Sequence, residues 1–344
     1  MIDSSALFVL KTLLQKGHKA YLVGGGVRDL LVNIRPKDFD IVTDARPQEV
    51  RRCFKRCYLI GRRFRLAHVH VEGKVIEVAT FRKGEIESTA LITEDNEFGD
   101  PEDDAKRRDF TINGLFFDLN ENQIIDYVEG IEDIKKRQIA TIGNPSARFR
   151  QDPVRMLRAL KFQAKIGFDI EENTKKALEE CLPFIVQSSQ ARLLEECLRI
   201  LESSFSATFF RLSLKTKLLH HLFPTLSIFY ETQKHPFYYL DIKDDWINQG
   251  QVFSRSCLFS LFVFEYFKVH LVTKYEGKKE PHMGQVTQDG IEFLNQLCAG
   301  FLHTPKRLKA DANFILCSQF RFTPIGSRVK IRNTFFRAKD FLNA

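Results

Sequence analysis

The sequence predicts an α/β domain with a small mixed β-sheet, followed by an all-α C-terminal region. Over roughly the first 140 residues, short apolar runs of strand character alternate with segments of helical periodicity, which is typical of α/β domains. After Phe168 few strand signals remain, and apolar residues recur at helical spacing, as at Leu193, Cys197, Ile200 and Leu201.

The expected elements of the first domain follow one another at short intervals. In chain order we expect a helix over 4–16, a strand over 20–23, a helix over 27–32, a strand over 39–43 and a helix over 47–54. Two further runs, 69–71 and 75–81, predict a hairpin that turns at 72–74. Strand-like runs over 110–118 and 123–127 complete the predicted sheet.

The pattern becomes helical after a glycine, an asparagine and a proline at 143–145, which are typical of a domain border. We therefore expect a first domain over 1–143 and two helical parts over 144–230 and 231–344. The polar stretch 274–288 contains glycine and proline and is expected to be a loop between helices.

Composition excludes several classes of protein. Lys and Arg number 52 against 44 Asp and Glu, so the formal net charge is +8, which favours RNA or DNA as a partner. The seven cysteines form no CxxC pair, which argues against a disulfide framework and a structural zinc site and favours a cytoplasmic protein. The N-terminus has no signal-peptide cleavage site, and no apolar run reaches the roughly 18 residues of a membrane span.

Three glycines at 24–26 follow a predicted strand and precede a predicted helix. Glycine lets the backbone approach a ligand closely, and the N–H groups at a helix start suit phosphate oxygens. A GxGxxG dinucleotide motif is excluded because Asp29 occupies its third glycine position, and a Walker loop is excluded because no Gly-Lys-Ser/Thr follows. Gly25, Gly26 and Arg28 are therefore candidates for contact with phosphate.

Asp38 and Asp40 are two residues apart on a predicted strand, so their carboxylates face the same side. Two like charges this close repel unless a cation lies between them, and Mg²⁺ binds through one or two carboxylates plus substrate phosphates. Glu77 is flanked by apolar residues on another predicted strand, where a buried charge would need a partner. An Asp-x-Asp can also be a solvated strand end, but the glycines and Glu77 favour a two-metal site for nucleotidyl transfer.

Residues 21–50, YLVGGGVRDLLVNIRPKDFDIVTDARPQEV, resemble the head of the class II nucleotidyltransferases, which comprise CCA-adding enzymes and bacterial poly(A) polymerases. The segments RRDFTINGL at 107–115, YVEG at 127–130 and QDPVRMLR at 151–158 resemble later motifs of that family, in the same order. The resemblance covers about residues 20–230. It implies a polymerase β-like nucleotidyltransferase head over 1–143, a helical neck over 144–230 that binds the base and RNA, and an RNA-binding body and tail over 231–344.

The resemblance also implies a role for individual residues. Asp38, Asp40 and Glu77 would be catalytic, with Mg²⁺ or Mn²⁺ bound by the two aspartates. The residues implied to bind the nucleotide are Gly25, Gly26, Arg28, Arg108, Asp109, Asn113, Asp152, Arg155 and Arg158. Gln151 stands where the family has Glu, and it keeps the hydrogen-bonding length without the charge.

The branch of the family is indicated by residues 60–69, which resemble a segment typical of bacterial poly(A) polymerases and contain the paired arginines Arg62 and Arg63. Residues 304–307, with Lys306 and Arg307, resemble a segment of the C-terminal region in that branch. These four cations are candidates for RNA binding. The resemblance implies a template-independent poly(A) polymerase that joins AMP from ATP to RNA 3′ ends. A CCA-adding tRNA nucleotidyltransferase and a non-catalytic RNA-binding protein on the same scaffold are the alternatives.

Overall fold

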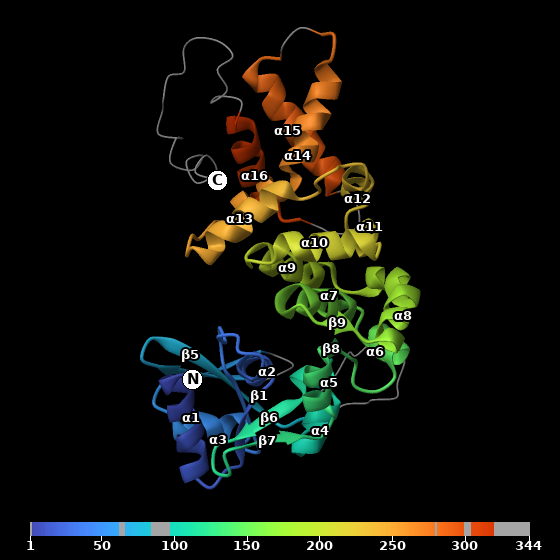
Figure 1. Cartoon of the computed structure of the whole chain (residues 1–344). Coiled ribbons are helices and arrows are strands. Elements are labelled where there is room, and N and C mark those ends of the chain that lie inside the picture. Colours follow the sequence, from blue (N-terminus) through green and yellow to red (C-terminus); the bar gives the residue numbers. More distant parts are fainter. Residues whose placement is uncertain (1, 62–65, 84–96, 279–280, 299–303, 320–344) are drawn as a thin grey trace. The chain divides into compact units, whose positions relative to one another are not determined.

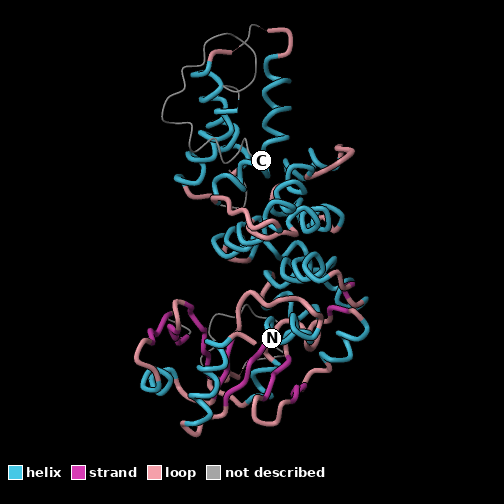
Figure 2. Tube along the Cα trace, turned by 60° about the vertical axis from the view of Figure 1, so that its left-hand side comes forward, coloured by secondary structure: helices cyan, strands magenta, loops and turns pink. Residues whose placement is uncertain are grey.

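A computed structural model describes residues 2–61, 66–83, 97–278, 281–298 and 304–319 (Figure 1). By its internal contacts the chain forms two compact units. The first comprises Met1–Arg155 and Ile166–Cys181, and the second Met156–Lys165 and Leu182–Ala344. Among the described residues, strands occur in the first unit, and the second is built of helices and loops (Figure 2). The α/β-then-α fold predicted from the sequence is confirmed, whereas the three-part division at 143/144 and 230/231 stays a prediction.

The first unit is built around a seven-stranded mixed sheet with the strand order β3-β4-β5-β2-β1-β6-β7. Neighbouring strands are antiparallel, except that β2 and β5 run parallel. The strands are β1 Ala20–Val23, β2 Asp40–Thr43, β3 Cys57–Ile60, β4 Leu66–Val71, β5 Lys74–Thr80, β6 Leu115–Asp118 and β7 Gln123–Asp126. The hairpin expected at 69–81 is therefore confirmed as β4–β5.

Short polar residues begin several helices of this unit. Asp3 accepts a hydrogen bond from the Ser5 N–H at 2.9 Å, and Asn144 accepts one from the Ala147 N–H at 3.0 Å, as N-caps do. The helices are α1 Ser4–Gln15, α2 Gly25–Leu31, α3 Pro47–Cys53, α4 Pro101–Lys106, η1 Thr111–Asn113, α5 Gly130–Lys136, α6 Pro145–Gln151 and α8 Glu172–Cys181. A short parallel pair, β8 Gln138–Ile139 and β9 Asp169–Ile170, joins two distant segments.

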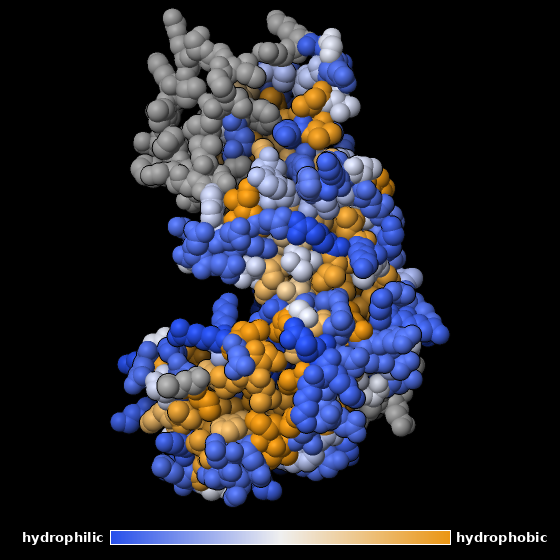
Figure 3. Space-filling view, viewed as in Figure 1, coloured by the Kyte–Doolittle hydropathy of each residue, from blue (hydrophilic) through white to orange (hydrophobic). Residues whose placement is uncertain are grey.

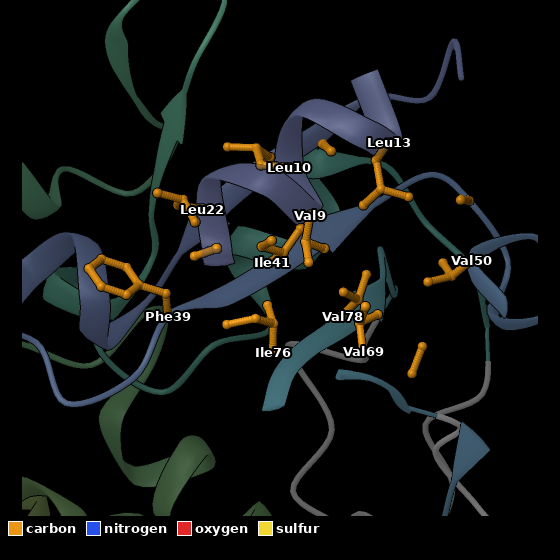
Figure 4. Close-up of a cluster of buried hydrophobic side chains, with 14 of the residues drawn as sticks. Val9, Leu10, Leu13, Leu22, Phe39, Ile41, Val50, Val69, Ile76 and Val78 are labelled. Atoms are coloured by element: carbon orange, nitrogen blue, oxygen red, sulfur yellow. The ribbon is translucent and has the colours of Figure 1, made fainter. Parts of the chain in front are cut away.

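The main core of the first unit lies between α1 and one face of the sheet (Figure 4). Val9, Leu10 and Leu13 of α1 pack in one cluster with Ile41 and Val78 of the sheet. Residues that alternate with these along the strands face the other side, where Val23, Val42, Phe81, Ala105 and Phe116 form a second, smaller cluster. Apolar side chains also gather over part of the outer surface of this unit (Figure 3).

The second unit packs its helices around α14, which contacts α9, α15 and α16. Its helices are α7 Val154–Ile166, which also belongs in part to the first unit, η2 Leu182–Gln187, α9 Gln190–Leu201, α10 Ser206–Lys215, α11 Leu218–Leu222, α12 Pro224–Glu231, α13 Tyr238–Asn248, α14 Arg255–Tyr275, α15 Met283–Leu297 and α16 Lys306–Ser318. Aromatic rings fill this core, with 4.3 Å between the ring centroids of Phe210 and Phe262.

α14 is the one helix of the described residues with the length and composition of a membrane span, although Glu265 and Lys268 interrupt its apolar run. The helix has 21 residues, and its most apolar 18-residue window has a mean hydropathy of 1.3. Half of its most apolar window is buried inside the structure, and the buried residues include Phe259, Phe262 and Phe267. Because core helices of globular units are apolar in the same way, we interpret α14 as the central core helix of the second unit.

Two expectations about secondary structure were wrong. Residues 110–118 are not one strand, because the 3₁₀ turn η1 occupies Thr111–Asn113 before β6 begins at Leu115. The Asp109 carboxylate accepts from the Phe110 N–H at 2.9 Å and stabilises this turn. The stretch 274–288 is loop only in part. α14 ends at Tyr275, and α15 begins at Met283 behind an N-terminal cap formed by His282, whose Nδ1 accepts from the Gln285 N–H.

Candidate active site

The predicted acidic residues lie where β2 and β5 run side by side. Asp40 begins β2 and is the direct cross-strand partner of Glu77 in β5, while Asp38 precedes β2 by two residues. All three side chains are exposed, and that of Glu77 is 52% exposed. The expectation of a buried Glu77 was therefore wrong. Its neighbours Ile76 and Val78 point into the α1 core, so strand alternation turns Glu77 to the opposite face.

The three carboxylates repel one another electrostatically. The pKa of Asp40 is raised to about 6, first because surrounding protein atoms desolvate its carboxylate and then because Asp38 and Glu77 are negative. Arg108 opposes this rise. Although Asp40 keeps exposed surface, it is crowded enough to lose hydration. Such a set of hard oxygen donors fits Mg²⁺ or Mn²⁺, whose charge would relieve the repulsion.

Glu77 takes a partner from the next strand rather than from the aspartates. Its Oε1 lies 3.4 Å from Nε2 of His68, which is its cross-strand partner in β4. Within the described part of the chain, no three His, Cys, Asp or Glu side chains come together closely enough to hold a metal ion. The donor set available around Asp38 and Asp40 thus consists of these two aspartates, with Glu77 one strand away.

The glycines at 24–26 allow close packing at the start of α2. Gly24 has φ +71°, a conformation that favours glycine, and a Cβ there would lie 3.1 Å from Nη1 of Arg108. A Cβ at Gly26 would lie 3.1 Å from the Phe39 ring and 3.2 Å from the Asp38 carbonyl oxygen. The backbone at Gly24–Gly26 therefore lies directly beside the Asp38 segment and Arg108.

Arg28 does not face solvent. Its side chain is 2% exposed, and its Nε and Nη2 donate to the Asp29 carboxylate at 3.0 and 2.6 Å. Its Nη1 donates to Oδ1 of Asn113, whose Nδ2 in turn donates to Oδ1 of Asp109 at 3.0 Å. Asp29, Arg28, Asn113 and Asp109 thus form one chain of hydrogen bonds that ends at a half-buried carboxylate.

Arg108 is held by a carboxylate that sequence reasoning missed. Asp104 is fully buried, and its Oδ2 and Oδ1 lie 2.8 Å from Nη2 of Arg108 and of Arg107, respectively. Burial disfavours the charged carboxylate, but the two arginines outweigh it and lower the pKa of Asp104. The available signal was a carboxylate three and four residues before two arginines, although only Asp104 lies within α4, and Arg107 and Arg108 follow its end.

The motif at 151–158 contains a second buried cluster. Oε1 of Gln151 accepts from Nη1 of Arg148 at 3.0 Å and from Nη1 of Arg155 at 3.3 Å. Arg148 also donates through Nη2 to the carbonyl oxygens of Arg107, at 2.6 Å, and Arg108. Arg148 was not predicted from the sequence, yet it ties the helix end at Gln151 to the backbone immediately before Asp109.

Asp152 and Arg155 lie next to this cluster. Asp152 follows α6, and its carbonyl oxygen accepts from the Arg155 N–H at 3.0 Å at the start of α7. Arg155 is buried and donates through Nη1 to the Arg148 carbonyl oxygen at 3.0 Å. Burial and the charge of Arg155 lower the pKa of Arg148 to about 10. The cluster is therefore rich in positive charge and contains a neutral acceptor at its centre.

The remaining predicted residues lie in the second unit or outside the described residues. Arg158 belongs to the second unit, where its guanidinium lies 5.3 Å from the centroid of the Phe162 ring. Lys306 and Arg307 are exposed in the first turn of α16, also in the second unit. Arg62 and Arg63 lie outside the described residues. Their roles stay predictions.

A cleft of about 1120 Å³ lies on the α1 side of the first unit. It is lined by the start of α1, by residues 33–39 and by the start of β5, and it includes Asp38 but neither Asp40 nor Glu77. Its lining contains none of the residues that cluster around Asp109. Apart from Asp38, the candidate residues lie outside this cleft, so we locate the candidate site by its chemistry.

The chain is similar to known proteins over most of its length. Residues 20–140 match the "Poly A polymerase head domain" and 167–229 the "Probable RNA and SrmB- binding site of polymerase A". Over 240 residues the chain is 42% identical to poly(A) polymerase I of Escherichia coli O6:H1, covering 67% of this chain and 52% of that protein. Over 185 residues it is 40% identical to the CCA-adding enzyme of Bacillus licheniformis, covering 54% and 46%.

A solved structure, the Bacillus stearothermophilus CCA-adding enzyme in complex with CTP, matches with a TM-score of 0.57 and 25% identity over 92% of this chain and 82% of that chain. The chain spans about half the length of the curated relatives it matches.

Proposed function

Because the chain belongs to the class II nucleotidyltransferases, the family of poly(A) polymerases and CCA-adding enzymes, we propose that it is a template-independent poly(A) polymerase. It would transfer AMP from ATP to RNA 3′ ends and release pyrophosphate in the cytoplasm. The observation that carries this proposal is the pairing of Asp40 with Glu77 beside the Gly24–Gly26 backbone and the Asp109 hydrogen-bond chain. The higher identity, 42% over 240 residues against 34% over 246 residues for a CCA-adding enzyme of Bacillus pumilus, favours the poly(A) branch.

Phosphoryl transfer of this kind depends on positioning and on charge stabilisation. The triphosphate would lie along Gly25, Gly26 and Arg108. Asp38 and Asp40 would hold Mg²⁺ or Mn²⁺, and Glu77 would complete the acidic site. The chemistry supplied by a bound divalent cation would be neutralisation of charge on the attacking and leaving oxygens. Arg28 would act as a positioning residue rather than as a phosphate contact.

Asp109 would accept a hydrogen bond from the ribose 2′-hydroxyl and so favour ATP over dATP. Its carboxylate is held by Asn113, which Arg28 holds in turn. Asp152 and Arg155 would present an acceptor and donors to the base edge, so that selection needs no template. The contact of Arg148 with the carbonyl oxygens of residues 107 and 108 supports one rigid frame for ribose and base reading.

RNA would be gripped in part by the second unit. The match of residues 167–229 to an RNA-binding region of polymerase A supports this, because residues 182–229 lie in the second unit, where Lys306 and Arg307 also offer exposed cations. Arg158 would assist in nucleotide binding from α7. Exposed cations bind the phosphate backbone without regard to sequence, so this contact would serve affinity more than choice.

One experiment separates the candidate functions. The protein is incubated with labelled RNA, Mg²⁺ and each nucleoside triphosphate in turn. Long ladders with ATP alone support the poly(A) polymerase. Addition limited to C, C and A on a trimmed tRNA supports the CCA-adding enzyme, which the 40% identity to such an enzyme makes the second candidate. RNA binding without extension by any nucleotide supports a non-catalytic RNA-binding protein and refutes the enzyme.

A further inference from the structure

The acidic site continues across the sheet as a row of side chains. Cross-strand pairing aligns Asp40 with Glu77, Glu77 with His68, and His68 with Tyr58. Directly paired residues project from the same face of a sheet. Because neighbouring strands are about 4.8 Å apart, Tyr58 lies roughly 14 Å from Asp40 along this row. Tyr58 is therefore on the same surface as the carboxylates, three strands away.

This part of the face is open to solvent, unlike the part over β1 and β6. There Val23 and Phe116 are buried in the second cluster. On β3, Tyr58 is 59% exposed. Its ring makes an edge-to-face contact with the His70 ring, at 5.2 Å between centroids and an interplanar angle of 86°. The contact orders two rings on an exposed strand pair without burying the tyrosine.

Cations border this aromatic surface. Lys55 and Arg56 immediately precede β3 and are exposed, whereas the exposed Arg51 and Arg52 lie on α3, which packs on the α1 side of the sheet. The carbonyl oxygen of Arg56 accepts from the His70 N–H at 2.9 Å, which fixes this basic segment beside the rings. Exposed aromatic rings next to a basic groove are the combination that binds single-stranded nucleic acid, because bases stack on the rings while cations contact the phosphates.

We propose that the exposed face of β3 and β4, with Tyr58, His68 and His70, is a stacking platform for the RNA bases that immediately precede the reacting 3′ end. This inference rests on the proposed function, and it adds the path that the RNA primer takes across the sheet. A strand whose 3′ hydroxyl lies at the Asp38–Asp40 site would cross His68 and reach Tyr58 along the same sheet face. The cations Lys55 and Arg56 at the border of this face are opposite in charge to the RNA backbone.

The test compares Tyr58→Ala, Tyr58→Phe and the control Phe8→Ala. Phe8 is exposed on α1, which packs on the opposite face of the sheet. Extension of labelled oligo(A) is measured as a function of RNA and of ATP concentration, and binding of the same oligo(A) is measured by fluorescence anisotropy without nucleotide. Tyr58→Ala should raise the KM for RNA and the Kd about tenfold, with the KM for ATP and kcat unchanged. Tyr58→Phe and Phe8→Ala should stay within about twofold of wild type.

Salt dependence supplies a second readout. Because stacking releases no counterions, Tyr58→Ala should leave the slope of log Kd against log salt unchanged, whereas Arg56→Ala should reduce it by about one. An unchanged Kd for Tyr58→Ala, or an equal loss in Tyr58→Phe, overturns the platform. If the wild type extends no RNA with any nucleotide, the proposed function fails, while the anisotropy comparison still decides whether Tyr58 contacts RNA.

Discussion

Carboxylates on the open sheet face and carboxylates in the interior beside it have pKa values shifted in opposite directions. On the face, Asp38, Asp40 and Glu77 keep exposed surface, and desolvation by the surrounding protein atoms, together with repulsion from Asp38 and Glu77, raises the pKa of Asp40 to about 6. In the interior, Asp104 is fully buried, yet two arginines lower its pKa. The exposed set is short of positive charge, whereas each buried charge described here has a partner inside the protein.

This difference separates residues that act on a ligand from residues that hold the site. The three exposed carboxylates would gain a countercharge from a bound cation, so changing them should affect activity more than folding. The buried arginines Arg28, Arg148 and Arg155 are engaged by protein acceptors, so changing them should first affect stability. Substitutions in each region test this distinction.

The largest effect on activity is expected for Asp40→Ala. Extension should be abolished, because the pair that would hold the metal loses one member, whereas the Tm should be unchanged or higher, because removing a crowded negative charge relieves repulsion. Incorporation of labelled AMP and thermal unfolding of the same preparation check both parts. Normal incorporation would remove Asp40 from the site, and a large drop in Tm would place it with the buried residues instead.

The largest effect on stability is expected for Arg148→Met. The change keeps a long side chain but removes the donors to Gln151 and to the carbonyl oxygens of residues 107 and 108. Each unpaired buried acceptor costs about 1–3 kcal/mol, so the free energy of unfolding of the first unit should fall by about 3 kcal/mol. Hydrogen exchange of peptides that cover residues 101–118 measures this loss of stability locally.

The control for this experiment is Arg150→Met, at an exposed arginine of the same helix. It should change the free energy of unfolding by less than about 0.5 kcal/mol. Equal protection of residues 101–118 in both variants would show that Arg148 does not hold the Arg107–Asp109 segment.

The fold could be predicted largely from local pattern. The strand over 20–23 and the hairpin after β4 follow from apolar alternation and from glycine at turns, both of which depend on neighbouring residues. For Glu77, the same alternation predicts exposure and not the burial that was expected. With Ile76 and Val78 inside, alternation requires Glu77 to face outward, and apolar neighbours in a strand therefore do not imply burial.

The buried polar network could not be predicted, because its contacts join distant segments. Arg148 bonds to the backbone of Arg107, which is 41 residues away in sequence. Arg28 likewise reaches Asn113, 85 residues away. Residue type alone made Arg28 a candidate for phosphate contact. Only the fold reveals that its donors are used by Asp29 and Asn113, and hence the positioning role that we propose for it.

Arg155 combines the two roles that the comparison separates. It is buried among protein acceptors, and it is also proposed to recognise the base of the nucleotide. Arg155→Ala should reduce the preference for ATP over CTP, GTP and UTP about tenfold, because a recognition site that loses a polar group rejects wrong bases less. Relative incorporation of the four nucleotides into one RNA primer measures this. Full ATP preference with lowered stability would assign Arg155 to the interior alone.

The smallest effect is expected for Gln151→Glu, which places a carboxylate between two buried guanidinium groups. Burial and the charge of Arg155 already lower the pKa of Arg148 to about 10, so a negative charge at this centre should be favourable. The two arginines should hold the pKa of the new carboxylate below its unfolded value of about 4.3. Its stabilisation, about 1 kcal/mol, is then present above that value and is lost as the pH falls through the folded pKa.

The measurement for Gln151→Glu is the difference in free energy of unfolding between variant and wild type from pH 7 to pH 3. The difference should favour the variant at pH 7 and shrink below about pH 4. The preference among nucleotides should change less than the efficiency of incorporation, because the Oε1 acceptor for Nη1 of Arg155 is kept. A variant that is less stable at pH 7 would mean that desolvation of the carboxylate outweighs its attraction to the arginines. A neutral acceptor at Gln151 would then be the more stable way to hold Arg148 and Arg155 together.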